Sequence, residues 1–237
     1  MKMFEFNVKL ADLKINILSG HEYTKRLFSD YICDSDEPCD IVIRYDDAEL
    51  ARECGNSPDF PVFYHESLLI YRKICTKIIE YNAMLIHSSA ISLDGKAYLF
   101  TAPSGTGKST HAGLWRAHFG ERAVMINDDK PIVRETDGQF FVYGTPYMGK
   151  HRLGANTKAP IKALCIIARG EKNEIERVRA ADHIPALLNQ TLLPSDEKLM
   201  DALFSTFERF IDRVPVYRLK CNISDEAVRV AYEGMNK

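Results

Sequence analysis

The sequence lacks any long apolar run. No segment approaches the roughly 18 to 20 consecutive apolar residues that a membrane-spanning helix needs, so no membrane partner is expected. The first residues, "MKMFEFNVKLADLKINIL", alternate apolar and charged side chains, a pattern typical of a strand and not of a signal peptide. We therefore expect a cytoplasmic protein.

The sequence also lacks an excess of positive charge. Its 31 Lys and Arg residues are balanced by 33 Asp and Glu residues, which gives a formal net charge of -2. Proteins bind a nucleic-acid backbone mainly with lysine and arginine side chains that neutralise its phosphates. Nucleic acid is therefore not an expected partner.

Paired cysteines are missing as well. The six cysteines are scattered along the chain, with neither a C-x-x-C pair nor a histidine spacing that would complete a metal site. We expect free thiols in a reducing compartment in preference to a disulfide framework or a zinc site.

The sequence does contain a mixture of strand and helix patterns. Its 237 residues, 46% hydrophobic and 27% charged, have the composition of an ordinary globular domain. Period-two alternation predicts two strands within residues 3–19 and a third at 40–45, and helical spacing begins at Ser67. We predict a mixed-sheet α/β protein that forms one compact unit, with a strand-rich N-terminal layer (1–82) packed on a nucleotide-binding core (83–237).

The core begins with two predicted strands, "LIHSSAISL" and "KAYLFTA", joined by the favoured hairpin pair Asp94-Gly95. The segment "KSTHAGLWRAHF" then predicts a helix from Lys108 that ends at Gly120. Further strands are predicted from "RAVMIN", "KPIVRE", "QFFVYG", "IKALCIIAR" and "VPVYRLK". Helices are predicted at 181–192, at 196–212 behind Ser195 and at 224–236 behind Ser224.

The segment "TAPSGTGKST", Thr101 to Thr110, is a phosphate-binding loop between a strand and a helix. The common pattern is G-x-x-x-x-G-K-[ST], and here Ala102 stands at the first glycine position. Such a loop binds phosphate because backbone N–H groups and a helix N-terminus point at the anion, and its glycines adopt positive φ. The predicted nucleotide-binding residues are Ser104, Gly105, Thr106, Gly107, Lys108, Ser109 and Thr110. Lys108 would reach the β- and γ-phosphates and Ser109 would ligate Mg²⁺.

A pair of aspartates follows the next apolar strand, in "AVMINDDKP". Adjacent carboxylates raise each other's pKa unless a cation neutralises them, and Mg²⁺ is the cation that a phosphate-loop enzyme provides. One of Asp128 and Asp129 would hold the metal, and the other would be free to accept a proton from an attacking hydroxyl. The alternative is a solvated turn at a strand end, because "NDDKP" is also favourable turn chemistry.

Histidines give weaker indications. His87 lies on the strand before the loop, where a lone histidine is more often a satisfied core or turn residue than a catalytic one. His111 and His118 are seven residues apart on the helix after the loop, with Trp115 between them. No carboxylate or cysteine completes a ligand set there, so we predict a packing face and not a metal site.

The segment "YGTPYMGKHRLGANTKAP", residues 143–160, has three glycines, two prolines and no apolar periodicity. Long loops in compact domains are often functional, and this one carries Lys150, His151 and Arg152. Lys150 and Arg152 are candidates to close over phosphates or to bind an acidic acceptor. A solvated connection is the equal alternative.

These motifs together resemble a known family. "APSGTGKST", a strand that ends in "NDD" and "IHSSA" upstream are similar to the phosphoenolpyruvate carboxykinase-like nucleotide-binding core. Within it they resemble the HPr kinase/phosphorylase group and its small relatives, some of which phosphorylate a serine of a lasso peptide. The resemblance covers about residues 83–170, and it implies that Ala102 is tolerated at the first loop position.

The resemblance also implies roles for the site residues. Asp128 would be the catalytic base, Asp129 a metal ligand with Ser109, and His87 a site residue at the end of the preceding strand. The roles of the two aspartates are interchangeable at this stage. The substrate-binding half of the carboxykinases and the glycine- and arginine-rich signature of the HPr kinases are missing, so neither decarboxylation nor HPr as acceptor is expected.

Two functions follow from the sequence. The first is a kinase that uses ATP and Mg²⁺ to phosphorylate a hydroxyl of a peptide, a protein or a small molecule, with Asp128, Lys108 and His87 as catalytic residues. The second is a regulatory protein in which nucleotide only switches the conformation of residues 143–160 for a binding partner. Neither the acceptor nor the oligomeric state follows from the sequence.

Overall fold

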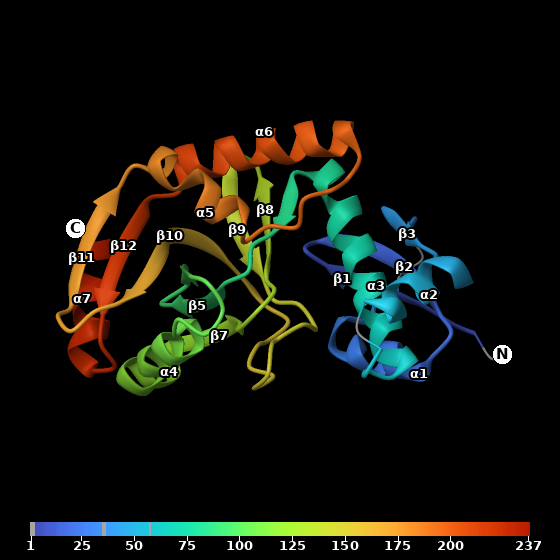
Figure 1. Ribbon diagram of the computed structural model, residues 1–237, viewed down its shortest axis with the longest axis horizontal. Helices are drawn as coiled ribbons and strands as arrows, with labels where there is room; N and C mark the ends of the chain where they lie inside the picture. The colour runs from blue at the N-terminus through green and yellow to red at the C-terminus, as the bar shows by residue number, and fades with distance from the viewer. Residues whose placement is uncertain (1–2, 35–36, 57) are drawn as a thin grey trace. The chain divides into compact units, whose positions relative to one another are not determined.

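The computed structural model of the protein describes residues 3–34, 37–56 and 58–237. The chain divides into two compact units, Met1–Ile79 and Glu80–Lys237 (Figure 1); the sequence analysis places this boundary at residue 82. Both units combine helices with strands, so the mixed α/β class predicted from the sequence is confirmed. Within the described residues, no helix is both long and apolar enough to cross a membrane.

The first unit is not the strand-rich layer that the sequence predicts. Its sheet has the order β1-β2-β3, with β1 and β2 antiparallel and β2 and β3 parallel. Three helices accompany the sheet, and two of them were not predicted. The elements are β1 (Phe4–Leu10), β2 (Leu13–Ser19), α1 (Glu22–Leu27), β3 (Ile41–Ile43), α2 (Asp47–Gly55) and α3 (Val62–Lys77).

Local capping explains one of the missed helices. At the start of α2 the Asp46 side chain accepts a hydrogen bond from the Glu49 backbone N–H, and the Glu49 carboxylate accepts one from the Asp46 N–H. This reciprocal capping box satisfies two otherwise free donors of the first turn. Helix α3 begins at Val62 behind Pro61, five residues before the predicted start at Ser67.

The second unit is built on a nine-stranded sheet. Its main order is β4-β8-β9-β10-β6-β5-β7, and β12 pairs with both β10 and β11. The long strand β10 pairs antiparallel with β9 near its start and parallel with β6 and β12 farther on. The strands are β4 (Ala83–Leu85), β5 (Ser89–Leu93), β6 (Lys96–Thr101), β7 (Ala123–Asn127), β8 (Ile132–Thr136), β9 (Gln139–Tyr143), β10 (Lys158–Arg169), β11 (Glu174–Val178) and β12 (Val216–Cys221).

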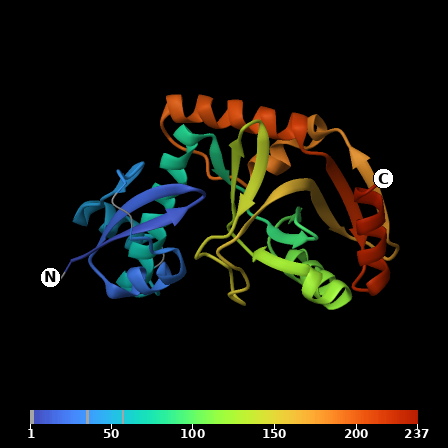
Figure 2. The same cartoon turned by 180° about the vertical axis from the view of Figure 1, so that it is seen from behind.

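Helices pack on this sheet at both ends of the second unit. Helices α4 (Lys108–Phe119) and α7 (Asp225–Met235) lie side by side near β5, β7 and β12, whereas α6 (Glu197–Arg213) runs along β8 and β9 (Figures 1 and 2). Trp115 of α4 is fully buried against Tyr98 and Phe100 of β6. The sheet and α4 therefore share one apolar core directly beneath the phosphate loop.

Several boundaries differ from the predicted ones. The Ser224 side chain caps α7 as predicted, but Asp196, and not Ser195, caps α6. The predicted helix 181–192 is only the short α5 (Ile184–Leu188), preceded by a 3-10 turn at Ala180–His183. Strand β11, whose residues are mostly charged, was not predicted at all.

The packing of α6 gives a test of the fold. Phe210 is fully buried and its ring meets Phe140 of β9 edge-on, with 5.2 Å between centroids, whereas Phe204 on the same helix is exposed. We expect Phe210→Ala to lower the free energy of unfolding by about 3 kcal/mol, the cost of emptying a buried aromatic site. Phe204→Ala is the control and should change it by less than about 1 kcal/mol in the same urea titration.

Candidate functional site

Residues 101–110, the predicted phosphate loop, have the predicted strand–loop–helix geometry. Strand β6 ends at Thr101 and α4 begins at Lys108, with Gly107 at the helix N-cap. Gly105 and Gly107 have φ of 76° and 125°, a region in which residues with a Cβ are strained. Ala102 is buried in the core and is not among the residues with positive φ, so the loop does not require glycine at that position.

Lys108 lies inside the loop. Its side chain is almost fully buried, and Nζ donates a hydrogen bond of 2.9 Å to the Ala102 carbonyl oxygen. Burial lowers the pKa of the Lys108 ammonium group, while the carboxylates of Asp129 and Asp128 act in the opposite direction. The lysine therefore lies in the electrostatic field of both aspartates.

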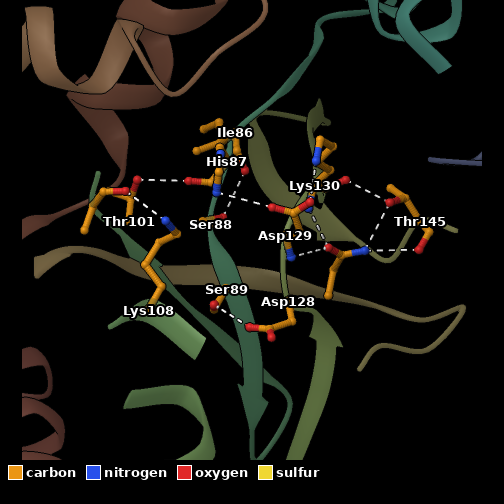
Figure 3. A network of polar contacts seen from close by, with 12 residues as sticks. Ile86, His87, Ser88, Ser89, Thr101, Lys108, Asp128, Asp129, Lys130 and Thr145 are labelled. Carbon is orange, nitrogen blue, oxygen red and sulfur yellow. Dashed lines mark hydrogen bonds and ion pairs between the residues drawn. The ribbon is translucent and has the colours of Figure 1, made fainter. Parts of the chain in front are cut away.

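The two aspartates have different surroundings. Asp128 is 5% exposed, and its Oδ1 accepts a hydrogen bond of 2.6 Å from Ser89 Oγ. Asp129 is more open; its Oδ1 lies 3.3 Å from His87 Nε2, and its Oδ2 pairs with Lys130 (Figure 3). Because Asp128 is buried, the pair is not the solvated turn that was the alternative interpretation.

Asn127 fixes the backbone of this turn. Its side-chain oxygen accepts hydrogen bonds from the N–H groups of Asp129 and Lys130, at 2.9 and 2.8 Å. Its side-chain nitrogen donates to the carbonyl and hydroxyl oxygens of Thr145, at 3.1 and 3.0 Å. An amide that is hydrogen-bonded on both sides fixes the backbone of the turn that carries Asp129 and Lys130.

His87 is not on a strand, contrary to the prediction. It lies between β4 and β5, where its backbone N–H donates to the Gln190 carbonyl oxygen at 2.7 Å and its own carbonyl oxygen accepts from Thr101 Oγ1 at 3.0 Å. These bonds replace strand pairing and turn the imidazole toward Asp129. Burial, with a smaller effect of Lys108, lowers the pKa of His87, so the ring is neutral near pH 7.

A cavity of about 310 Å³ collects most of the predicted site residues. Its lining comes from the loop, from the aspartate turn and from the segment after β9. The lining residues are His87, Ser104, Gly105, Gly107, Lys108, Ser109, Thr110, Asp128, Asp129, Gly149, Lys150 and His151. Of the other predicted residues, Thr106 lines a neighbouring cavity, and Arg152 lines neither of the two.

Gly149 is a site residue that the sequence analysis missed. Its φ is 69°, and a Cβ at this position would lie 3.0 Å from the Asp129 Cβ. Only glycine permits such a close approach in this conformation. The segment that carries Lys150 and His151 therefore lies directly against the aspartate turn.

A larger cavity of about 620 Å³ lies on the other side of the loop and shares Gly105, Gly107 and Thr110 with the first. Its wall is largely apolar, with Leu114 and Ile167, and Ile223 at its rim is 77% exposed. The remaining lining residues are Thr106, His111, Arg169, Gly170, Cys221 and Asn222. This cavity could not be predicted from the sequence, because the ends of β10 and β12 meet only in the folded sheet.

His111 is a packing residue, as predicted. Its Nε2 accepts a hydrogen bond of 3.0 Å from Trp115 Nε1, and its ring meets Phe100 edge-on. The described part of the chain contains no group of three or more His, Cys, Asp or Glu side chains placed to hold a metal ion. Mg²⁺ usually takes only one or two carboxylates and completes its shell with phosphates and water, so Ser109 with Asp129 or Asp128 fits that requirement.

Burial lowers the pKa of His111 to about 4, which predicts acid sensitivity of the fold. Below about pH 6.5 the unfolded chain protonates this histidine and the folded chain does not, so stability falls as the pH falls toward 4. We expect a loss of about 2 kcal/mol between pH 7 and pH 5, at about 1.4 kcal/mol for each unit of pKa difference. Urea unfolding of wild type and His111→Gln at both pH values measures this loss of stability. An equal loss in the variant would show that His111 is not its cause.

The chain is similar to a described protein family and to a solved structure. A protein-family model described as "ScmC: SynChlorMet cassette protein ScmC" matches residues 64–228. No curated protein matches the chain. A solved structure, the Hpr(Ser) kinase/phosphatase from Coxiella burnetii, is similar over 65% of this chain and 99% of that chain, with a TM-score of 0.35 and 11% identity. Likeness at that level carries no argument about activity.

Proposed function

The chain belongs to the family of SynChlorMet cassette protein ScmC. From the geometry of its candidate site we propose that the protein is a kinase. It would use ATP and Mg²⁺ to transfer the γ-phosphoryl group to a hydroxyl of a peptide, a protein or a small molecule. One observation carries the proposal: the phosphate loop, Lys108, Ser109 and both aspartates line the same cavity. Phosphoryl transfer needs this set, because its catalysis consists mainly of positioning and charge neutralisation.

We propose that Ser109 and Asp129 would be the protein ligands of Mg²⁺. Bound Mg²⁺ would neutralise the charge that develops on the β- and γ-phosphate oxygens. The Ser109 hydroxyl and the more open of the two carboxylates are oxygen donors of the kind that Mg²⁺ prefers. The ion pair of Asp129 with Lys130 would then be exchanged for a bond to the metal.

We propose that Asp128 accepts the proton of the attacking hydroxyl. This carboxylate is buried and accepts one hydrogen bond, from Ser89 Oγ to Oδ1, and that bond orients the group. The fixed orientation leaves the carboxylate beside Lys108 and Ser109 in the same cavity. Asp128 would accept the proton of the attacking hydroxyl while Lys108 and the metal stabilise the transferred group.

The acceptor would enter beside Gly149, Lys150 and His151. Lys150 and His151 line the aspartate cavity and present nitrogen donors to a substrate there. The neutral imidazole of His87 lies next to Asp129 and would orient that carboxylate. Arg152, the other predicted loop residue, has no assigned role.

The larger cavity supports a nucleotide as the donor in preference to pyrophosphate. It adjoins the loop from the side opposite the aspartates, and its apolar wall of Leu114, Ile167 and Ile223 suits the face of a base. A nucleoside on that side would direct its triphosphate across Gly105 and Gly107 toward Lys108.

A regulatory protein without phosphoryl transfer is the second candidate. The close contact of Gly149 with Asp129 favours it, because a metal bound at Asp129 would move the segment that carries Lys150. Under this alternative the nucleotide changes a binding surface and Asp128 accepts no proton.

A transfer assay distinguishes the two functions. Purified protein is incubated with γ-labelled ATP, Mg²⁺, a cell extract and a panel of serine peptides. The kinase predicts label on an acceptor with the wild type and none with Asp128→Asn. Nucleotide binding of low-micromolar affinity with no labelled acceptor in any mixture would favour the regulatory protein.

A further inference from the structure

Arg169 contacts the phosphate loop through two backbone carbonyl oxygens. It is the last residue of β10, on the strand next to β6, and its exposed side chain lines the larger cavity. Its Nη2 donates a hydrogen bond of 2.6 Å to the Gly105 carbonyl oxygen, and its Nε donates a longer one of 3.3 Å to the Thr106 carbonyl oxygen. The guanidinium group therefore holds two successive peptide groups of the loop.

These two contacts determine which way the loop amides point. In a trans peptide the C=O and the following N–H point in opposite directions. The Gly105–Thr106 peptide is held at both ends, because the Thr106 N–H also donates to the Pro103 carbonyl oxygen at 3.2 Å. The Thr106–Gly107 peptide is held by Arg169 at its oxygen, which directs the Gly107 N–H away from the guanidinium.

The loop needs such a constraint because of its own glycines. Gly105 and Gly107 flank Thr106 at φ of 76° and 125°, and a glycine restricts the orientation of the adjacent peptides less than any other residue. The Lys108 contact with the Ala102 oxygen cannot supply it, since a triphosphate competes for the same ammonium group. Arg169 binds carbonyl oxygens that face away from the phosphates, so its contacts are compatible with a bound nucleotide.

We propose that Arg169 is a positioning residue of the phosphate loop, which fixes the Gly105–Gly107 peptides in the orientation that binds a triphosphate. The inference rests on the proposed nucleotide-binding function. Arg169 acts through the backbone and accepts no proton from the substrate, so its loss changes nucleotide affinity more than the chemical step.

The test compares Arg169→Ala, Arg169→Lys and the control Arg218→Ala. Arg218 is a partly exposed arginine of the adjacent strand β12, and its side chain pairs with Glu176. Two quantities are measured: the hydrogen-exchange rate of the Thr106 amide without nucleotide, and the dissociation constant and kinetics with Mg·ATP. Lysine keeps the charge but cannot donate to two carbonyls in the fixed geometry of a guanidinium.

We expect both Arg169 variants to speed exchange at Thr106 and to weaken ATP binding by roughly tenfold, the loss of a charge-assisted hydrogen bond. KM should rise with kcat nearly unchanged, and Arg218→Ala should behave as wild type. Wild-type exchange in both Arg169 variants, or full recovery of ATP affinity by lysine, would overturn the proposal. If the wild type binds no ATP, the kinase proposal fails, whereas the exchange rates still decide whether Arg169 holds the loop.

Discussion

Replacement of Lys108 by alanine is expected to lower kcat/KM for phosphoryl transfer by about 10³-fold, the cost of removing one preorganised group that stabilises charge in the transition state. Nucleotide affinity should fall as well, because the ammonium group contacts the phosphates before and during transfer. A γ-labelled ATP assay gives the rate, and calorimetric titration with Mg·ATP gives the affinity.

The reason for this large effect lies in the surroundings of Lys108. Its side chain is buried beside the loop, and Nζ is held against the Ala102 carbonyl oxygen at 2.9 Å, so its charge is fixed in place before the phosphates bind. Lys96→Ala at the exposed start of β6 is the matched control and should retain full activity. Transfer at the wild-type rate by Lys108→Ala would show that the loop is not the phosphate site.

The position of the phosphate loop and the positive φ of its glycines could be predicted from the sequence because both are determined locally. Gly105, Gly107 and Lys108 are close in sequence, and the strand and helix that flank them have clear periodicity. The hairpin at Asp94 and Gly95 was predicted for the same reason, and both residues have the expected positive φ. Short-range turn chemistry thus predicted the position of the loop and the φ region of its glycines.

The surroundings of the aspartates could not be predicted because they depend on long-range contacts. Ser89 is 39 residues from Asp128 in sequence, and Arg169 is 64 residues from Gly105. No periodicity or spacing links such pairs, because the order of strands in the sheet brings them together. The error at His87 has the same origin, since its backbone bond to Gln190 interrupts a segment whose composition is typical of one continuous strand.

The helices of the first unit were missed for a different reason. The strand-rich prediction followed the alternating residues 3–19 and overlooked the capping box of Asp46 and Glu49, which is a readable signal in "DDAELAREC". Helix α1 has only six residues, too few for helical periodicity to appear. Helix α2 could therefore have been predicted from the sequence, whereas helix α1 could not.

The aspartate pair allows the two carboxylate roles to be separated by experiment. Asp128→Asn is expected to lower kcat by about 10³-fold, within the range for loss of a general base, with nearly unchanged ATP affinity. Asp129→Asn should instead raise the Mg²⁺ concentration required for half-maximal rate, because a metal ligand is lost. Each substitution removes one charge and preserves shape, so each variant is the steric control of the other.

The dependence of rate on Mg²⁺ concentration for the two variants decides the assignment. A base at Asp128 predicts that excess Mg²⁺ restores part of the rate of Asp129→Asn and none of the rate of Asp128→Asn. The reverse pattern would exchange the two roles, which the sequence left open. Ser89→Ala removes only the donor to Asp128 Oδ1 and should lower kcat less than Asp128→Asn, because the carboxylate remains. If both aspartate variants lose ATP affinity equally and neither responds to Mg²⁺, then neither carboxylate is the base.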